Sequence, residues 1–164
     1  MRKIIREFSC KYGFLSNFYP VKILYNGLEY QNAEAAFQGQ KPFNKTDRKN
    51  FCTMGASQAK AAGRQCYLRK DWEEVKDQIM YEVVMAKFTQ NIFLKNSLLE
   101  TGNAELIEGT SWNDLYWGID LYSGNGLNHL GQILEKVREE LGGWKRDYEE
   151  PDWLKKIKKI DSNA

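Results

Sequence analysis

The stretch VKILYNGLEYQNAEAAFQGQK, residues 21–41, contains the strongest fold signals in the chain. Asn26-Gly27 lies between two β-prone runs, and both residues of such a pair accept a positive φ, so the sequence predicts a two-residue β-hairpin. Asn32 then has the right place and side chain to cap a helix over residues 33–41, which Pro42 closes. A hairpin leading into a helix indicates that strands and helices share one fold.

Outside this stretch the pattern is mostly helical. We expect helices over residues 46–54, 58–68, 71–89, 92–100 and 129–141, with Ser57 and Asp71 as caps, and short strands over residues 4–8, 106–108 and 115–118. The predicted fold class is α+β, a mainly helical single domain with a small antiparallel β-sheet. We expect the domain over residues 1–143 and a charged, amphipathic and helical tail over residues 144–164. For the tail, docking on the domain, a dimer contact and contact with nucleic acid remain open.

The 164 residues suit one domain of ordinary size, and 42% apolar against 28% charged residues is typical of a globular chain. The net charge is only +2, but it is divided unevenly. Residues 1–70 carry 13 basic and 4 acidic side chains, whereas residues 71–164 carry 11 basic and 18 acidic ones. A near-neutral chain divided in this way can still present a positive surface to phosphates.

Several classes of protein are excluded. No apolar run approaches the roughly 20 residues of a membrane helix, and the N-terminal residues have no signal-peptide pattern, so we expect a cytoplasmic protein without a membrane partner. Cys10, Cys52 and Cys66 are an odd set without a Cys-x-x-Cys motif, and His129 is the one histidine. We therefore expect no metal site, no cofactor and no disulfide framework.

The helix at residues 33–41 carries the first candidate site. Glu34, Gln38 and Lys41 follow at i, i+4 and i+7, which places a carboxylate, an amide and an amine on one face. This pattern also fits a solvated face with weak side-chain pairs.

Two polar loops rich in aromatic residues are candidates for binding a flat ring. The first, GFLSNFY at residues 13–19, offers Ser16, Asn17 and Phe18; the second, SWNDLYWG at residues 111–118, offers Trp112, Asp114, Trp117 and Gly118. Both loops are equally compatible with core packing and turn formation.

Phosphate binding has two candidates. Lys60 and Arg64 lie at i, i+4 on one predicted helix, although they also fit ordinary surface charges. Asn128 and the glycines around it precede the helix at 129–141, whose free N–H groups would attract an anion. His129 fits a structural hydrogen-bonding residue better than a base.

The order of these pieces along the chain resembles the NADAR (YbiA-like) family over about residues 4–141. The resemblance rests on GFLSNFY at 13–19, EAAFQGQK at 34–41, AKAAGR at 59–64, NDLYWG at 113–118 and NHLG at 128–131. One departure is visible, because the family often has Glu-His where this chain has Glu34-Ala35. Either that histidine is dispensable, or this member has lost a function.

The resemblance implies hydrolysis of an N-glycosidic bond without a metal. Some members resemble antitoxins that remove ADP-ribose from guanine in nucleic acid, and others are similar to enzymes that split ribosylaminopyrimidine phosphates of riboflavin biosynthesis. We expect the first activity, on ADP-ribosylated DNA or RNA and in functional pairing with a DNA ADP-ribosyltransferase toxin. A small ribosyl phosphate substrate and a non-catalytic ADP-ribose-binding module are the alternatives.

The residues suit this chemistry. Glu34 and Asp114 are the expected carboxylates for the oxocarbenium-like carbon and the departing nitrogen, and Lys41 offers attack on the anomeric carbon or a Schiff base instead. The expected substrate-binding residues are Ser16, Asn17, Phe18, Gln38, Lys60, Arg64, Trp112, Trp117, Gly118 and Asn128. The sequence does not decide between the mechanisms, nor does it fix the oligomeric state.

Overall fold

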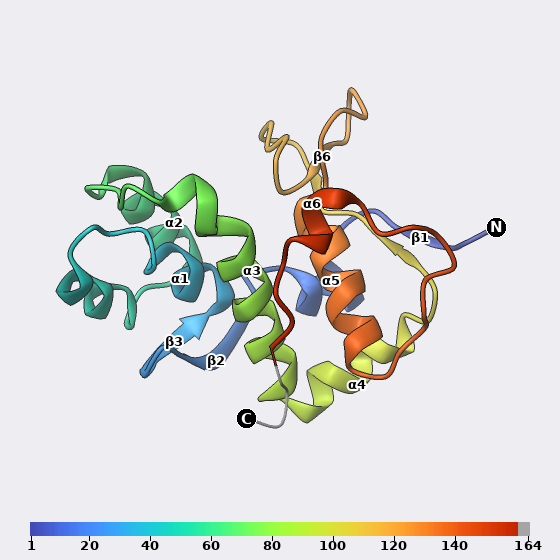
Figure 1. Ribbon diagram of the computed structural model, residues 1–164, viewed down its shortest axis with the longest axis horizontal. Helices are drawn as coiled ribbons and strands as arrows, with labels where there is room; N and C mark the ends of the chain where they lie inside the picture. The colour runs from blue at the N-terminus through green and yellow to red at the C-terminus, as the bar shows by residue number, and fades with distance from the viewer. Residues whose placement is uncertain (161–164) are drawn as a thin grey trace. The chain divides into compact units, whose positions relative to one another are not determined.

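A computed structural model describes residues 1–160, which divide into two compact units (Figure 1). Unit 2 is the continuous segment Asn17–Gln90, and unit 1 combines Met1–Ser16 with the chain from Asn91 onward. Helices and short strands occur in both units, so the α+β class is confirmed. Within the described residues, no helix is both long and apolar enough to cross a membrane.

The predicted hairpin is present in unit 2. Strands β2 (Pro20–Tyr25) and β3 (Leu28–Asn32) pair antiparallel around Asn26 and Gly27, whose φ angles are 48° and 79°. The inward-facing Ile23 and Tyr30 are cross-strand partners and both fully buried. The hairpin thus supplies a buried face that leads directly into the first helix.

Helix α1 (Ala33–Gln38) begins as predicted but ends early. Asn32 Oδ1 accepts a hydrogen bond from Ala35 N at 2.7 Å, as a helix cap does. After Gln38 the backbone tightens, because Gln40 N donates to Phe37 O and Lys41 N donates to Gln38 O, each at 3.1 Å. Lys41 therefore lies beyond the helix on which the sequence placed it.

The rest of unit 2 is helical and packs against α1. It consists of the 3₁₀ helix η2 (Lys45–Phe51), α2 (Ala56–Gln65) and α3 (Trp72–Thr89). The predicted cap Ser57 is wrong, because α2 begins after Gly55 without a side-chain cap. Helix α3 begins after Asp71 as predicted, but the Asp71 carboxylate binds Arg69 at 2.6 Å and makes no capping hydrogen bond.

Unit 1 contains short strand pairs and two longer helices. Its elements are β1 (Ile4–Ile5), the 3₁₀ helix η1 (Cys10–Leu15), α4 (Ile92–Glu100), β4 (Glu105–Leu106), β5 (Gly109–Thr110), β6 (Ile119–Asp120) and α5 (His129–Glu140). The pairs β1–β4 and β5–β6 are parallel, so the expectation of one antiparallel sheet holds for the hairpin alone. About 100 residues separate β1 from β4, which is ample for a parallel crossover, whereas only residues 111–118 connect β5 to β6.

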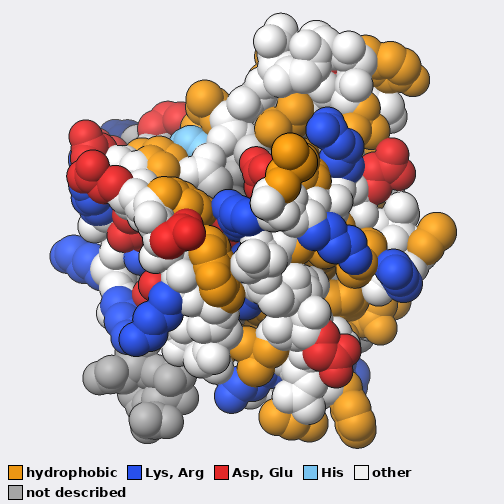
Figure 2. Space-filling view, turned by 90° about the vertical axis from the view of Figure 1, so that its right-hand side faces the viewer, with side chains coloured by type: hydrophobic (Ala, Val, Ile, Leu, Met, Phe, Trp, Pro, Cys, Tyr) orange, Lys and Arg blue, Asp and Glu red, His pale blue; other side chains and the backbone are white. Residues whose placement is uncertain are grey.

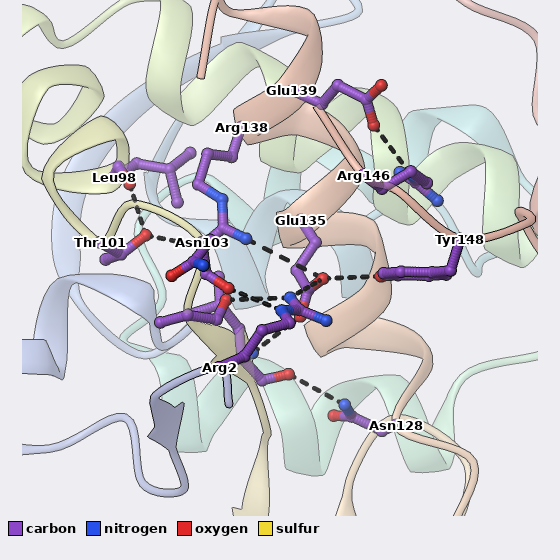
Figure 3. Close-up of polar contacts among 12 residues, drawn as sticks. Arg2, Leu98, Thr101, Asn103, Asn128, Glu135, Arg138, Glu139, Arg146 and Tyr148 are labelled. Atoms are coloured by element: carbon purple, nitrogen blue, oxygen red, sulfur yellow. Dashed lines mark hydrogen bonds and ion pairs between the residues drawn. The ribbon is translucent and has the colours of Figure 1, made fainter. Parts of the chain in front are cut away.

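The tail is part of unit 1, and between residues 144 and 160 only α6 (Asp152–Lys155) is an α-helix, so the expectation of a helical tail holds for that turn alone. Leu154 and Ile157 are buried, and Tyr148 Oη donates to Glu135 Oε2 of α5 at 3.0 Å. Glu135 also accepts from Arg2 at 2.8 Å, so this one carboxylate connects the N-terminal segment, α5 and the tail (Figure 3). Of the three roles left open for the tail, docking on its own unit is present in the structure.

Candidate active site

Helix α1 holds a buried carboxylate–amide pair inside unit 2. Glu34 is 8% exposed and Gln38 is 6% exposed, and Gln38 Nε2 donates to Glu34 Oε1 at 2.8 Å. Glu34 N also donates to Asn17 O at 3.0 Å, which fixes the start of the helix against the predicted binding loop. The interpretation of this face as solvated is therefore wrong for Glu34 and Gln38.

Gly63 of α2 allows this pair to be packed so closely. A Cβ atom at Gly63 would lie 1.9 Å from Gln38 Oε1, so only hydrogen fits there. Gln38 Oε1 is buried, and within the described residues it has no hydrogen-bond partner. The close packing of α2 therefore encloses this oxygen and holds the Gln38 amide in place.

Lys41 follows the helix in a partly buried place. Its Nζ lies 5.5 Å from the centre of the Trp72 ring, which in turn packs against Phe37. Burial lowers the pKa of Lys41 below its ordinary value, the Glu34 charge opposes this shift, and the Arg64 charge adds to it. Burial thus increases the fraction of neutral amine, the form that can act as a nucleophile.

Glu34 and Lys41 interact electrostatically, although Lys41 lies beyond the end of the helix that carries Glu34. Glu34, Lys41 and Arg64 are close enough for their charges to shift one pKa value. Trp72 is the member that sequence reasoning missed, because it was assigned only to the start of a helix. Unit 2 therefore brings together a carboxylate, an amide and an amine with a lowered pKa.

The other expected binding residues of unit 2 lie partly at its surface and partly in its interior. Phe18 is 43% exposed, and Lys60 Nζ lies 5.8 Å from the centre of its ring. Asn17 is buried, with Nδ2 3.3 Å from Met80 Sδ. Arg64 is exposed one turn after Lys60 on α2. These positions leave an aromatic ring and two cations accessible to a ligand.

In unit 1, Asp114 forms a turn. Its Oδ1 accepts hydrogen bonds from Tyr116 N at 3.2 Å and Trp117 N at 3.0 Å. Because one carboxylate oxygen binds two successive N–H groups, residues 115–118 form a turn and not the strand that the sequence predicted. Asp114 therefore has a structural task, whatever else it does.

The aromatic residues after Asp114 pack around His129. Tyr116 lies 4.4 Å and Trp117 6.3 Å from His129 between ring centres, and Trp153 of the tail stacks on the imidazole at 3.6 Å. Trp117 is thus an edge of an aromatic cluster, whereas Trp112 is 56% exposed. His129 is buried in this cluster, which agrees with a structural role.

Ser16 and Trp112, both expected to bind substrate, line one pocket of about 340 Å³ in unit 1. Its polar lining includes Ser9, Ser111 and two carboxylates that sequence reasoning missed, Glu7 and Glu108. Their positions between ordinary loop residues give no sequence signal. The pocket offers an exposed indole beside hydroxyl and carboxylate oxygens, which suits a ring with N–H groups.

Asn128 and Gly118 help to hold neighbouring backbone segments together. Asn128 Nδ2 donates to Leu106 O at 2.9 Å, and its Oδ1 accepts from Glu108 N at 3.0 Å. A Cβ atom at Gly118 would lie 2.3 Å from Glu108 O, so this glycine allows two chain segments to meet.

The predicted phosphate site at the start of α5 is wrong. The N–H groups of Asn128, His129 and Leu130 donate to the carbonyl oxygens of residues 118, 116 and 117. An anion would have to displace these bonds, because N–H groups attract an anion only while they lack a partner.

The predicted residues therefore fall into two sets. Glu34, Lys41 and five expected binding residues belong to unit 2, and Asp114 belongs to unit 1. Within residues 1–160, no group of three or more His, Cys, Asp or Glu side chains is arranged to hold a metal ion.

Comparison with known proteins shows the family to which this chain belongs. The NADAR domain model matches residues 5–142. N-glycosidase YbiA of Escherichia coli (strain K12) is 38% identical over 135 residues, covering 79% of this chain and 82% of the relative. The riboflavin biosynthesis protein VVA0006 of Vibrio vulnificus is 40% identical over 133 residues, covering 79% of this chain but 36% of the relative. The NMR structure of E. coli YbiA has a TM-score of 0.75, with 37% identity and 86% of each chain covered. This chain belongs to the NADAR domain family.

Proposed function

We propose that this protein is an N-glycosidase that removes ADP-ribose from guanine bases in DNA. The observation that carries the proposal is the buried Glu34–Gln38 pair beside Lys41, an amine whose pKa is lowered by burial. The family relatives named N-glycosidases support the type of bond, and the guanine-linked substrate is the finer part of the proposal.

In the carboxylate route, Glu34 stabilises the positive charge that develops on the ribose. As the bond between the anomeric carbon and nitrogen breaks, the ribose carbon gains oxocarbenium character. A carboxylate held by Gln38 can stabilise that carbon without moving during the reaction. Water then adds to the carbon, and the departing nitrogen takes up a proton.

The amine route uses Lys41 as a nucleophile. Neutral Lys41 attacks the anomeric carbon, the bond to the base nitrogen breaks, and the base leaves with a proton. The ribose ring of this adduct opens to give a Schiff base with Lys41, and water hydrolyses the Schiff base to release the ribose and regenerate the amine. The lowered pKa of Lys41 favours this route, because more of the amine is neutral near pH 7.

Charge favours a nucleic-acid substrate over a small one. Residues 1–70 carry nine more basic than acidic side chains, and Lys60 and Arg64, one turn apart on α2, are the proposed contacts of the pyrophosphate. The alternative substrate, a ribosylaminopyrimidine phosphate, is favoured by similarity to the riboflavin biosynthesis protein VVA0006. An antitoxin role, paired with a DNA ADP-ribosyltransferase toxin, follows only from the first substrate.

The direct test is turnover of a guanine-ADP-ribosylated oligonucleotide beside turnover of the aminopyrimidine substrate. We expect release of ADP-ribose from the oligonucleotide, and a Glu34→Gln variant slower by roughly 100-fold or more. Release of ribose 5-phosphate alone would establish the alternative substrate. Binding of ADP-ribose without turnover of either substrate would indicate a non-catalytic module.

Two variants separate the mechanisms. Borohydride should trap a covalent ribose adduct at Lys41 during turnover, and Lys41→Arg should abolish the adduct while retaining the positive charge. Asp114→Asn retains an acceptor for the N–H groups of Tyr116 and Trp117, so it tests proton transfer without opening the turn. Full activity of Asp114→Asn would show that Asp114 stabilises the turn and does not transfer a proton.

A further inference from the structure

Two ammonium groups meet at one tyrosine ring near the N-terminus. Lys3 Nζ donates to Tyr12 Oη at 2.8 Å and lies 5.4 Å from the ring centre, and Lys11 Nζ lies 5.0 Å from the same centre. Two like charges drawn to one ring repel each other, and an anion between them relieves that repulsion. The hydrogen bond from Lys3 and both lysine charges lower the pKa of Tyr12, as expected at a positive site.

Pockets lie on both sides of this segment. A pocket of about 370 Å³ is lined by Lys3, Lys11 and Tyr12, and another of about 540 Å³ is lined by Arg6, Lys11 and Tyr12. Because Lys11 and Tyr12 line both pockets, an extended ligand can pass from one to the other. A single phosphate would fill only one of them.

A buried guanidinium adds positive charge behind the first pocket. Thr101 lines that pocket and accepts a hydrogen bond from Arg138 at 2.8 Å. Arg138 is fully buried, and its Nε and Nη2 atoms have no hydrogen-bond partner within residues 1–160. The nearby carboxylate of Glu135 is 3.9 Å from Nη2, and Glu100 is the acidic residue in the pocket lining.

The backbone presents Lys11 and Tyr12 at a cost. Cys10, just before them, has a φ of 50°, a conformation that a residue with a side chain seldom adopts. Strained positions of this kind are found preferentially at functional sites. The strain begins η1, the short helix that carries both residues.

We propose that residues 3–12 form a binding site for the sugar–phosphate backbone of a nucleic acid, with Lys3, Arg6 and Lys11 contacting successive phosphates. Figure 2, viewed from the side on which the N-terminus lies in Figure 1, shows Lys and Arg side chains at the surface among apolar and acidic ones. The site lies wholly within unit 1. It goes beyond the proposed function, because it binds unmodified nucleic acid and breaks no bond.

The test is fluorescence anisotropy with an unmodified 20-nucleotide single strand at several salt concentrations. The double variant Lys3→Gln/Lys11→Gln should bind at least about fivefold more weakly at low salt, since each lost phosphate contact removes released counterions. The slope of log K against log salt should fall by about 1.4. Lys3→Arg/Lys11→Arg should bind as the parent does, and thermal melting checks that each variant is folded.

Matched controls come from the tail. Lys156 and Lys159 are also exposed, so Lys156→Gln/Lys159→Gln makes the same change of charge outside the site. The proposal is overturned if this control loses binding as strongly as the Lys3/Lys11 variant, or if the parent does not bind the strand. A mononucleotide or inorganic phosphate that binds as tightly as the strand would equally overturn it. Turnover of a small ribosyl substrate by the Lys3/Lys11 variant tests the proposed catalysis separately.

Discussion

Gly63→Ala should damage both stability and catalysis through a single contact. The new Cβ atom would lie 1.9 Å from Gln38 Oε1 and 2.8 Å from Gln38 Cδ, where ordinary contacts begin at 3.4 Å. The Gln38 amide must therefore move by about 1.5 Å inside a buried site, and this movement breaks its hydrogen bond to Glu34.

The size of the effect follows from three contributions. Alanine in a helix interior is about 1 kcal/mol better than glycine. Overpacking of a core costs about 1–3 kcal/mol, and loss of a hydrogen bond to a charged group costs about 1.5–3 kcal/mol. We expect the free energy of unfolding to fall by about 1.5–5 kcal/mol. We expect kcat/KM to fall about 100-fold as Glu34 loses its orientation.

Urea denaturation and turnover measure the two effects. Ala61→Gly, at an exposed position of the same helix, measures the helix-propensity contribution alone. In a Gln38→Ala background the clashing amide is absent, so Gly63→Ala should there be neutral or stabilising by up to about 1 kcal/mol. An equal loss of stability in both backgrounds would refute the reasoning, as would a Gly63→Ala variant more stable than the parent.

Three further outcomes are expected. Lys41 should react with an amine-directed reagent at pH 8 faster than an exposed lysine does, as measured by mass spectrometry. Glu34→Gln should speed the reaction further, because the Glu34 charge raises the pKa that burial lowers. Slower labelling of the variant would contradict this. In urea denaturation, Glu135→Ala should lower the free energy of unfolding by about 3–5 kcal/mol, because it leaves the buried Arg138 without a nearby carboxylate. Glu139→Ala, at a more exposed ion pair, should lower it by about 1 kcal/mol or less. Trp153→Ala should expose the tail to limited proteolysis, because it removes the stack on the His129 imidazole. Trp153→Phe should restore protection. Equal cleavage of the parent and both variants would show that other contacts hold the tail.

Local signals in the sequence predicted the elements whose stabilising contacts are themselves local. The Asn26-Gly27 turn, the Asn32 cap and the helix at Ile92–Glu100 are examples, since neighbouring residues supply each of them. Local signals misled where a second partner competes. Arg69 takes the carboxylate of Asp71, which therefore caps no helix.

The candidate site was predictable in part. The order of motifs indicated the family, and spacing placed Glu34 and Gln38 on one face, but burial of that face depends on α2 and α3 packing against it. The contribution of Gly63 depends on a contact between two helices, and no pattern in either helix specifies it. The Glu7 and Glu108 lining of the unit 1 pocket likewise depends on segments about 100 residues apart.

The interruption of unit 1 by unit 2 has a consequence for synthesis on the ribosome. Strand β1 pairs with β4, Ile4 with Glu105, so the first strand must wait for about 100 further residues before its partner exists. Unit 2 is continuous over Asn17–Gln90 and meets no such delay. Because closing a long loop is slow and domains tend to fold as the chain emerges, we expect unit 2 to fold first, with the N-terminal segment left open until the second half arrives. During that interval we expect the basic side chains of this segment to stay open to the phosphates of ribosomal RNA; they are Arg2, Lys3, Arg6 and Lys11.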